Sequence, residues 1–316
     1  MRRPRLQPRR ARIALATLIA IASCGGASAA LASEVSSQVS SNWAGYFATT
    51  GSSTHRLAKR FTAVSGTWVQ PTAVCTPGSP TYSAFWVGLG GYSDSSQALE
   101  QIGSEADCSS SGQVSDYAWY ELVPAGPYTI ARITVSPGDV ISASVSVSGT
   151  KVKLSLRDVT AATHYTLTTK MSSPKPDTSS AEWIAEAPSN CNQNNYCTPL
   201  PLTNFGSVSF SDATASSVGT AGKTTGKIDD KAWIYGPITL QSSTGHFRFN
   251  QNLDVSSAAP SGLAVGGKGF VVTYGTGVPG GSTGPSGTSG TSGTTGTSGT
   301  SGTSGTTGTT GTTGTT

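Results

Sequence analysis

The stretch VISASVSVSGTKVKLSLRD, residues Val140 to Asp158, is the clearest indication of the fold class in the chain. Its two halves place apolar side chains at every second position, with mostly Ser, Lys or Arg between them. The apolar positions are Val145, Val147, Val152, Leu154 and Leu156. This alternation is typical of a strand with one buried and one solvated face, and Ser148-Gly149-Thr150 reads as a turn between two such strands. The stretch therefore predicts an antiparallel β-hairpin.

Short runs of the same kind recur on both sides of this hairpin, and Gly, Pro, Ser or Asn separates them. They are FTAVSGTWVQ from Phe61, YSAFWVGLG from Tyr82, VSDYAWYELV from Val114, YTIARITV from Tyr128, AEWIAE from Ala181, GSVSF from Gly206, AWIYGPITL from Ala232 and KGFVVTYG from Lys268. No window of a dozen residues shows the helical period. With 11% charged residues and 39 Gly in 316, the chain also lacks the helix formers of a helical protein. We therefore predict an all-β fold, a two-sheet antiparallel β-sandwich.

The N-terminus has the pattern of a secretory signal peptide, predicted over residues 1–32. An Arg-rich start is followed by the apolar run Ile13 to Ser23 and by small residues that suit a cleavage site. A second interpretation is a bacterial lipobox, in which Cys24 is acylated. The apolar run is about half the length that spans a bilayer, and no longer one follows. We expect a secreted protein, with lipid anchoring through Cys24 as the alternative.

The C-terminus has the composition of a flexible linker. From Gly280 to Thr316 every residue except Pro285 is Gly, Ser or Thr, so the segment has no apolar surface to bury. We predict a disordered tail over residues 276–316 and one β-sandwich domain over residues 33–275. A passive tail is the preferred interpretation, and a wall-spanning or O-glycosylated stalk is the alternative.

The formal net charge of +4 arises from the N-terminus. Six of the 20 basic residues lie in the first twelve positions, which leaves 14 basic and 16 acidic residues, a charge of about −2, for the rest. The body has no run of Lys and Arg. We therefore do not expect nucleic acid or another polyanion as a partner.

Four cysteines remain beyond the signal peptide, an even number that indicates two disulfides in an exported chain. Cys191 and Cys197 bound the short polar turn CNQNNYC, so we expect them to pair with each other, which leaves Cys75 for Cys108. The three histidines, His55, His164 and His246, have no metal-ligand spacing to a cysteine. We assign no metal and no cofactor.

The body of the sequence lacks the familiar hydrolase motifs. It has no G-x-S-x-G elbow and no HExxH or GxxxxGK[ST] pattern, and with few histidines and paired cysteines we expect neither a serine nor a cysteine protease. Carboxylate chemistry remains.

Three glutamates, Glu121, Glu182 and Glu186, lie in runs that are otherwise apolar or aromatic, and Gln101 lies in the short apolar stretch ALEQIG. A buried carboxylate is costly unless it is paired or hydrogen-bonded, although for any single Glu a structural role is the more common explanation. Together with several tryptophans, these residues indicate a ligand-binding cleft. Two classes fit: a hydrolase in which a carboxylate activates water, either a two-glutamate glycosidase or a peptidase, and a non-catalytic sugar-binding sandwich.

The order of motifs resembles the glutamic peptidases, the eqolisin family. The matching segments are SNWAGY (41–46), AVSGTWVQP (63–71), FWVGLGG (85–91), ALEQIG (98–103), YAWYEL (117–122), ITVSPGD (133–139), AEWIAE (181–186) and the Cys191 to Cys197 loop. Eight short matches in the family's order cover most of the body. The resemblance implies a β-sandwich of the concanavalin A-like lectin/glucanase type.

The resemblance also implies the roles of individual residues. It places the catalytic carboxyl at Glu186 and the catalytic amide at Gln101, with Trp86 and Glu121 as supporting residues; we add Glu182 as a neighbouring candidate. It implies an acid endopeptidase that acts on protein or peptide substrates, and we expect a monomer. A non-catalytic carbohydrate- or peptide-binding sandwich is the main alternative. The chain departs from the fungal pattern at Gly90, where that pattern has an Asp.

Overall fold

The computed structural model describes residues 33–34, 37–50, 58–192, 197–220, 222–241 and 256–276. Within these ranges the regular secondary structure consists of strands alone, and no helix meets the length and apolarity that a membrane span requires. The predicted signal peptide, the lipobox cysteine and all but the first residue of the predicted tail lie outside the described residues. Those boundaries therefore stay predictions.

Nineteen strands are present in the described ranges. They are β1 Ser33–Glu34, β2 Gln38–Ser40, β3 Trp43–Thr49, β4 Ala58–Val69, β5 Ala84–Gly90, β6 Leu99–Cys108, β7 Val114–Val123, β8 Tyr128–Thr134, β9 Val140–Ser148, β10 Lys151–Asp158, β11 Thr163–Lys170, β12 Ser180–Glu186, β13 Ser189–Cys191, β14 Cys197–Pro199, β15 Ser207–Gly219, β16 Gly222–Lys227, β17 Ile234–Gln241, β18 Ser256–Pro260 and β19 Phe270–Thr276.

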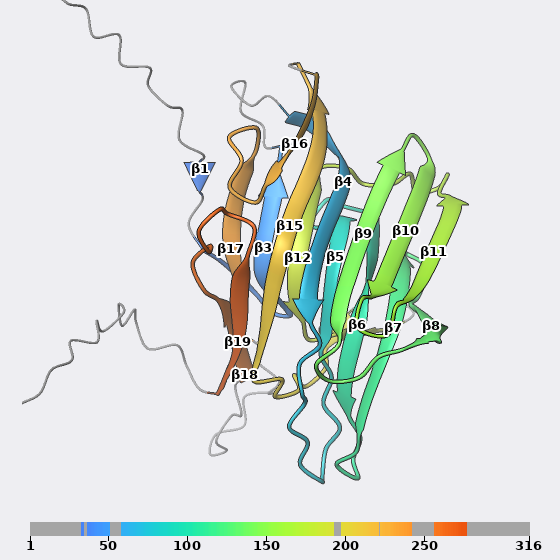
Figure 1. The fold of residues 1–316 in the computed structure, drawn as a ribbon, viewed down its shortest axis with the longest axis vertical. Helices are drawn as coiled ribbons and strands as arrows, with labels where there is room; N and C mark the ends of the chain where they lie inside the picture. The colour runs from blue at the N-terminus through green and yellow to red at the C-terminus, as the bar shows by residue number, and fades with distance from the viewer. Residues whose placement is uncertain are drawn as a thin grey trace, which may run out of the picture. The chain divides into compact units, whose positions relative to one another are not determined.

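Most of these strands form two packed layers (Figure 1). Sheet I consists of β11, β10, β9, β4 and β15 in that order, and sheet II consists of β17, β3, β12, β5, β6, β7 and β8. Strand β15 also pairs with β16 and β19, and β18 joins β19 to β17, so that the two layers are continuous. All of these pairs are antiparallel; β1 and β2 add parallel pairs to β17. The predicted all-β antiparallel sandwich is confirmed.

The hairpin of β9 and β10 buries the apolar positions that its sequence predicts. Its five alternating Val and Leu side chains are all buried, and Gly149 takes the turn with a φ of +63° that suits glycine. Two tryptophans link the layers through the core. The indole Nε1 of Trp183 in β12 donates to the carbonyl of Ser65 in β4 at 2.8 Å, and Trp68 in β4 donates to Ser104 Oγ in β6 at 2.9 Å.

Strands β3 and β6 are among those missing from the sequence prediction. In β6 nine of the ten residues are buried, among them Glu100, Gln101 and Glu105, so no alternation of polar and apolar residues marks it. It lies between β5 and β7 in the middle of sheet II, and residues on both of its faces are buried. A strand buried on both sides loses the period-two pattern that identifies a half-exposed one.

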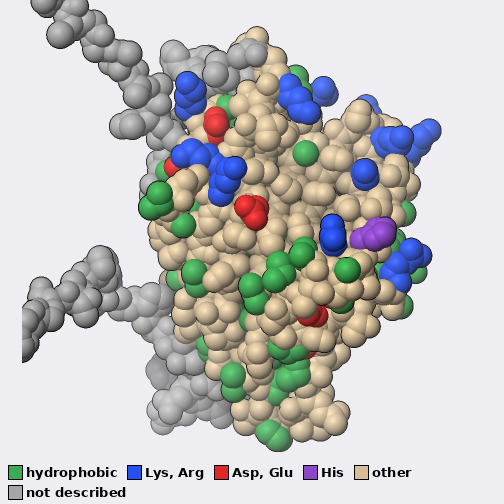
Figure 2. All heavy atoms as spheres, in the orientation of Figure 1, with side chains coloured by type: hydrophobic (Ala, Val, Ile, Leu, Met, Phe, Trp, Pro, Cys, Tyr) green, Lys and Arg blue, Asp and Glu red, His purple; other side chains and the backbone are tan. Residues whose placement is uncertain are grey.

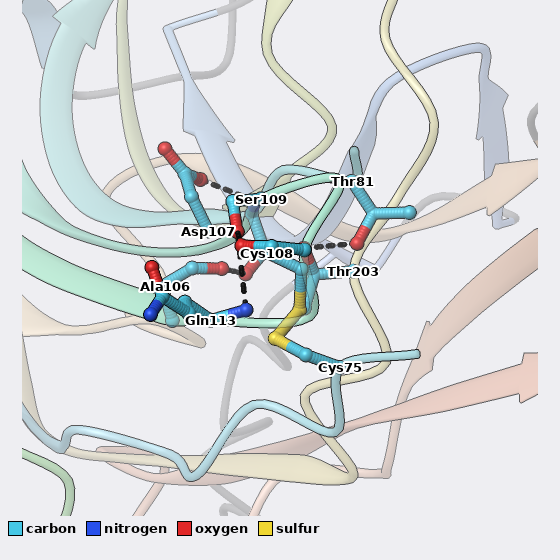
Figure 3. The surroundings of a disulfide bond; sticks show 10 residues. Cys75, Thr81, Ala106, Asp107, Cys108, Ser109, Gln113 and Thr203 are labelled. Atoms are coloured by element: carbon cyan, nitrogen blue, oxygen red, sulfur yellow. Dashed lines mark hydrogen bonds between the residues drawn. A yellow bond between two sulfur atoms is a disulfide. The ribbon is translucent and has the colours of Figure 1, made fainter. Parts of the chain in front are cut away.

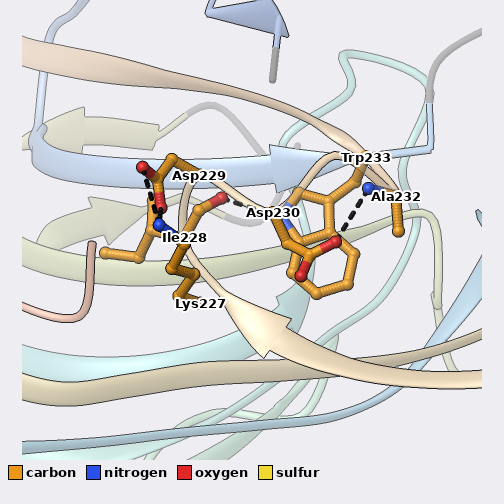
Figure 4. A network of polar contacts seen from close by, with 6 residues as sticks. All are labelled: Lys227, Ile228, Asp229, Asp230, Ala232 and Trp233. Carbon is orange, nitrogen blue, oxygen red and sulfur yellow. Dashed lines mark hydrogen bonds and ion pairs between the residues drawn. The ribbon is translucent and has the colours of Figure 1, made fainter. Parts of the chain in front are cut away.

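A tight turn connects β16 to β17 and thereby joins the two layers (Figure 4). The Asp230 carboxylate accepts the backbone N–H of Ala232 at 2.9 Å, and the indole of Trp233 donates to the carbonyl of Ile228 at 2.7 Å. At its start Lys227 forms an ion pair with Asp229 at 3.1 Å. The buried Trp233 ring anchors the turn to the core.

Candidate active site

Four neighbouring strands of sheet II bring the predicted site residues onto one face. Directly paired residues point to the same side of a sheet, and successive residues alternate. From β12 through β5 and β6 to β7, the paired positions are Glu182, Gly88, Gln101 and Glu121; Ile184, Trp86, Gly103 and Trp119; and Glu186, Ala84, Glu105 and Tyr117. We call this side the carboxyl face. It is turned away from sheet I, because the intervening Trp183 reaches sheet I.

Glu186 is held by two donors. The indole Nε1 of Trp86 donates to its Oε2 at 2.7 Å, and the side-chain amide of Asn42 donates to its Oε1 at 2.9 Å. The ring of Trp43 meets that of Trp86 edge-on, with 5.1 Å between centroids. Glu186 itself stays partly exposed, so water can reach its carboxyl group.

Burial raises the pKa of Glu186 to about 7, and the charge of Glu121 adds to this rise. The contacts with Trp86, Trp43 and Asn42 act against it, because they stabilise the ionised form. A carboxyl group with this pKa has both protonation states available near neutrality. It is therefore suited to accept a proton and to return it.

Two glycines make room for the Trp86 indole on the carboxyl face. A Cβ atom at Gly88 would lie 2.8 Å from Trp86 Cζ3, and one at Gly103 would lie 2.6 Å from Trp86 Cβ and 2.1 Å from the Phe85 carbonyl. The indole therefore lies close against the sheet backbone. A larger residue at either position would move the ring that donates to Glu186.

Gln101 lies two strands away from Glu186 and is 4% exposed. Its Nε2 donates to Glu121 Oε2 at 2.6 Å, while its buried Oε1 has no hydrogen-bond partner among the described residues. A buried acceptor left unpaired is costly and indicates a place for a ligand or water. Burial raises the pKa of Glu121, and the hydrogen bond from Gln101 partly offsets that effect.

A second group of acidic residues continues the row of Glu186. Glu105 lies opposite it across the small Ala84, and the Tyr117 hydroxyl donates to Glu105 and, at 3.1 Å, to Asp107. Burial raises the pKa of Glu105 to about 8, with further contributions from Asp107 and from Glu186. The sequence analysis missed this group. Its signal was the spacing, because Glu105 follows Gln101 by four residues and so shares its face.

Glu182 occupies the opposite end of the carboxyl face from Glu186. It is 0% exposed, and neither carboxylate oxygen forms a hydrogen bond of normal geometry with a described residue, although the nearby Ser180 hydroxyl favours the ionised form slightly. Burial raises its pKa well above the ordinary value. The structure therefore does not bring Glu182 into the group around Glu186, so Glu182 does not supply an exposed second carboxylate for a two-glutamate glycosidase.

Asp177 fills the space beside Gly90, the position at which the chain departs from the fungal pattern. A Cβ atom at Gly90 would lie 2.5 Å from the Asp177 Cβ, and Gly90 has a φ of +87°. The Asp177 backbone N–H donates to buried Glu100 at 3.3 Å. A carboxyl group thus occupies this place, but a different segment of the chain supplies it.

A groove of about 900 Å³ adjoins the site. Asn42 and Trp43, the neighbours of Glu186, form part of its wall, and Tyr92 and Ile238 line it further along. Tyr92 stacks on Phe47 with 3.9 Å between ring centroids. The groove therefore offers aromatic and polar surface next to the partly exposed carboxyl group.

Both expected disulfides are present. Cys75 pairs with Cys108 at the end of β6, with 5.3 Å between Cα atoms, and Cys191 pairs with Cys197, with 3.9 Å (Figure 3 shows the first). Beside the first, Thr81 and Cys108 exchange backbone hydrogen bonds of 3.0 and 2.8 Å. The bond ties the segment before β5 to the strand that carries Gln101. In the described ranges, no group of three or more His, Cys, Asp or Glu side chains is placed to hold a metal ion.

Comparison with known proteins assigns the family. The model of the Peptidase A4 family matches residues 41–246, which is well over half of the chain. The chain belongs to the Peptidase A4 family. As a member it is a peptide hydrolase of the glutamic endopeptidase type, and the resemblance to eqolisins is confirmed. No curated protein matches the sequence significantly.

Solved structures of glutamic peptidases are similar to the chain. A scytalido-glutamic peptidase with a peptide-based transition-state analogue is 24% identical, with a TM-score of 0.51, and the match covers 74% of this chain and 98% of that one. The eqolisin SCP-B, in complex with the tripeptide Ala-Ile-His, is 24% identical with a TM-score of 0.49 and the same coverage. Aspergilloglutamic peptidase from Aspergillus niger is 26% identical with a TM-score of 0.44, covering 61% and 99%. The first of these likenesses supports the fold.

Proposed function

We propose that this family member is a secreted endopeptidase in which Glu186 and Gln101 together hydrolyse the peptide bond. The observation that carries the proposal is the setting of Glu186, a partly exposed carboxyl group held by Trp86 and Asn42 with a pKa raised to about 7. Gln101 lies on the same face with an unpaired acceptor. The two disulfides suit an oxidising, extracellular location.

In the first step the Glu186 carboxylate takes a proton from a water molecule while the water oxygen attacks the scissile carbonyl carbon. The carbonyl oxygen becomes negative, and the side-chain amide of Gln101 donates the N–H that Glu121 does not use to this oxygen. The unpaired Oε1 of Gln101 is available to hold the attacking water. Glu121 fixes the amide, because a carboxylate accepts only from its N–H₂ side.

In the second step the tetrahedral intermediate breaks its C–N bond. Protonated Glu186 gives its proton to the departing amine and is restored as a carboxylate, and the acyl half leaves as a carboxylic acid. One water molecule is consumed and no covalent enzyme intermediate forms. Gln101 carries no charge at any pH, so its donor role does not titrate.

The raised pKa of Glu186 sets the working pH. Because the carboxylate is the form that activates water, activity rises as the pH increases toward about 7. Burial also raises the pKa values of Glu105 and Glu121, so these two groups stay neutral over more of the acid range than ordinary glutamates. We therefore place the optimum near the pKa of Glu186, at about pH 7, rather than in strong acid.

The proposal is tested with the purified secreted protein and a denatured protein substrate from pH 2 to 8, with pepstatin as a control for aspartic peptidases. We expect internal cleavages, identified by mass spectrometry of the fragments, that pepstatin does not suppress. Intact substrate at every pH, or inhibition by pepstatin, would overturn the proposal. Retention on immobilised peptide or glycan without cleavage would instead favour the non-catalytic binding sandwich.

A further inference from the structure

The outer face of sheet I carries exposed cations on β10 and β11. Lys151, Lys153 and Arg157 project from alternate positions of β10, and Lys170 projects from β11. Lys223 in β16 approaches from the other side. We call these five residues the cationic face. In Figure 2 blue side chains gather at the upper right, over the strands that Figure 1 labels β9, β10 and β11.

The arrangement costs stability. Lys151 lies directly opposite Lys170, and Arg157 lies directly opposite His164. Like charges at directly paired positions of a sheet repel each other. A sequence selected for stability alone would place a carboxylate in one member of each pair.

No counter-charge relieves this repulsion within the described part of the chain. None of the five cations forms an ion pair there, whereas Lys227, outside the cationic face, pairs with Asp229 (Figure 4). The acidic side chain of the β10–β11 hairpin, Asp158, is completely buried and accepts the backbone N–H of Ala161. The cationic face is thus open to an external anion.

A hollow of about 360 Å³ lies between three of these lysines, Lys151, Lys153 and Lys223. The hydroxyl-bearing residues that also line it are Thr62, Ser146, Ser148 and Thr168. Ammonium and hydroxyl groups donate hydrogen bonds to oxyanions such as sulfate and phosphate esters, and hydroxyls also bind sugar hydroxyls. The hollow therefore has hydrogen-bond donors for a sulfate or phosphate ester and for the sugar that carries it.

The extent of the cationic face selects a polymer over a single small anion. Lys151 and Arg157 are six residues apart on one strand, which corresponds to about 20 Å. The side chains facing outward between them and on the neighbouring strands are largely Ser and Thr, such as Ser144, Ser155 and Thr166. Among the described residues of this face, no Trp, Tyr or Phe offers a ring on which nucleic-acid bases would stack.

We propose that the cationic face binds an extended glycan that carries sulfate or phosphate ester groups. The absence of a Lys and Arg run in the sequence pointed away from polyanions, but a strand brings every second residue to one side, so spaced cations gather without a run. This face belongs to the opposite sheet from the carboxyl face, and a bound polymer leaves the candidate active site open. The proposal does not depend on the peptidase chemistry.

The test measures binding of the full secreted chain to immobilised dextran sulfate, to a phosphorylated mannan and to neutral dextran, at low and high salt. The variant carries Lys151→Glu, Lys153→Glu and Lys223→Glu. A control of equal charge change carries Lys175→Glu, Lys231→Glu and Lys268→Glu, three exposed lysines outside this face. Circular dichroism and the melting temperature establish that both variants are folded.

We expect binding to one or both charged glycans but not to neutral dextran, and loss of that binding at high salt. Affinity should fall at least about tenfold in the cationic-face variant and less than about threefold in the control. The charged glycan that the protein binds shows whether the cationic face recognises sulfate or phosphate esters. No binding to either, an equal loss in the two folded variants, or tighter binding of duplex DNA than of both glycans would overturn the proposal.

Discussion

The two outer faces of the sandwich carry opposite kinds of ionisable group, acidic on sheet II and basic on sheet I, in opposite surroundings. On sheet II the carboxyl groups are buried, fixed by donors such as Trp86 and Tyr117, and their pKa values are raised. On sheet I the lysines are exposed and unpaired among the described residues. Burial suits a carboxyl group to proton transfer, because it brings the pKa near the working pH. Exposure leaves a lysine charged, so that it attracts anions from a distance.

The largest expected effect contrasts two glutamates of one strand. Glu186→Gln should lower kcat/KM by about 10² to 10⁴-fold, the usual contribution of a general acid–base, since the amide can neither accept nor return the proton. Glu182→Gln, the same change four residues away, should leave activity within a few-fold, because that carboxyl group is completely buried and forms no hydrogen bond with Glu186 or Gln101. Steady-state assays on peptide substrate compare the two; equal losses would refute the assignment of Glu186.

The next effect concerns stability and pH. The pKa values of Glu100 and Glu105 are raised to about 8, that of Glu186 to about 7, and that of Glu182 well above 4.5. The folded state therefore binds protons more tightly than the unfolded state, so stability is greatest below about pH 4.5 and is lost as the pH rises toward about 8. One pKa unit corresponds to about 1.4 kcal/mol.

Thermal melting at pH 4 and pH 8 checks this sign. We expect a melting temperature several degrees lower at pH 8, since about 1 kcal/mol moves it by about 2 to 4 °C in a domain of this size. Glu182→Gln should reduce the difference, because the amide needs no proton to be buried. A melting temperature that increases from pH 4 to pH 8 would contradict the burial of these carboxyl groups as the dominant influence.

Two substitutions, one on each face, compare how much the faces contribute to the free energy of unfolding. Tyr117→Phe removes the hydroxyl that donates to Glu105 and Asp107, and we expect it to cost about 1 to 3 kcal/mol of unfolding free energy. Lys151→Ser removes a charge that faces Lys170, and its effect should stay within about 0.5 kcal/mol, on the stabilising side. Urea denaturation measures both. A larger loss for Lys151→Ser would show that the cationic face is structural.

The smallest effect is a shift of the acid limb of the kcat/KM profile. Trp86→Phe removes a donor to the Glu186 carboxylate and should move the limb to higher pH, while Glu121→Gln removes a negative charge and should move it to lower pH. Each shift should be on the order of half a unit to one unit. If both variants shifted the acid limb in the same direction, or if the limb lay near the ordinary glutamate pKa, the contacts described for Glu186 would not control its pKa.

Much of the fold follows from local pattern. The hairpin of β9 and β10 shows its alternation in the sequence, and the structure buries the residues which that pattern predicts. Strand β6 escaped prediction because residues on both of its faces are buried, Glu100 on one face and Gln101 on the other. Polar and apolar residues alternate along a strand only when one face is buried and the other is exposed, and the two faces of β6 do not differ in this way.

The candidate site was predictable only in part. The motifs identify Gln101, Trp86 and Glu186, and the register brings them to one face. Asn42 contacts Glu186 from 144 positions away, and Asp177 fills the space at Gly90, contacts that no local spacing encodes. The pKa of Glu186 also depends on burial by several strands at once, so the sequence alone does not give the pH optimum.

The central claim is that an amide and a carboxyl group act on the same peptide bond, and the kinetics of Gln101→Ala test it most directly. We predict a fall in kcat of about 10² to 10³-fold with KM little changed, since the lost hydrogen bond forms with the negative oxygen of the intermediate. The exposed Gln113→Ala serves as the control and should retain full activity. An unchanged kcat with a raised KM would contradict the claim and reduce Gln101 to a substrate-binding residue.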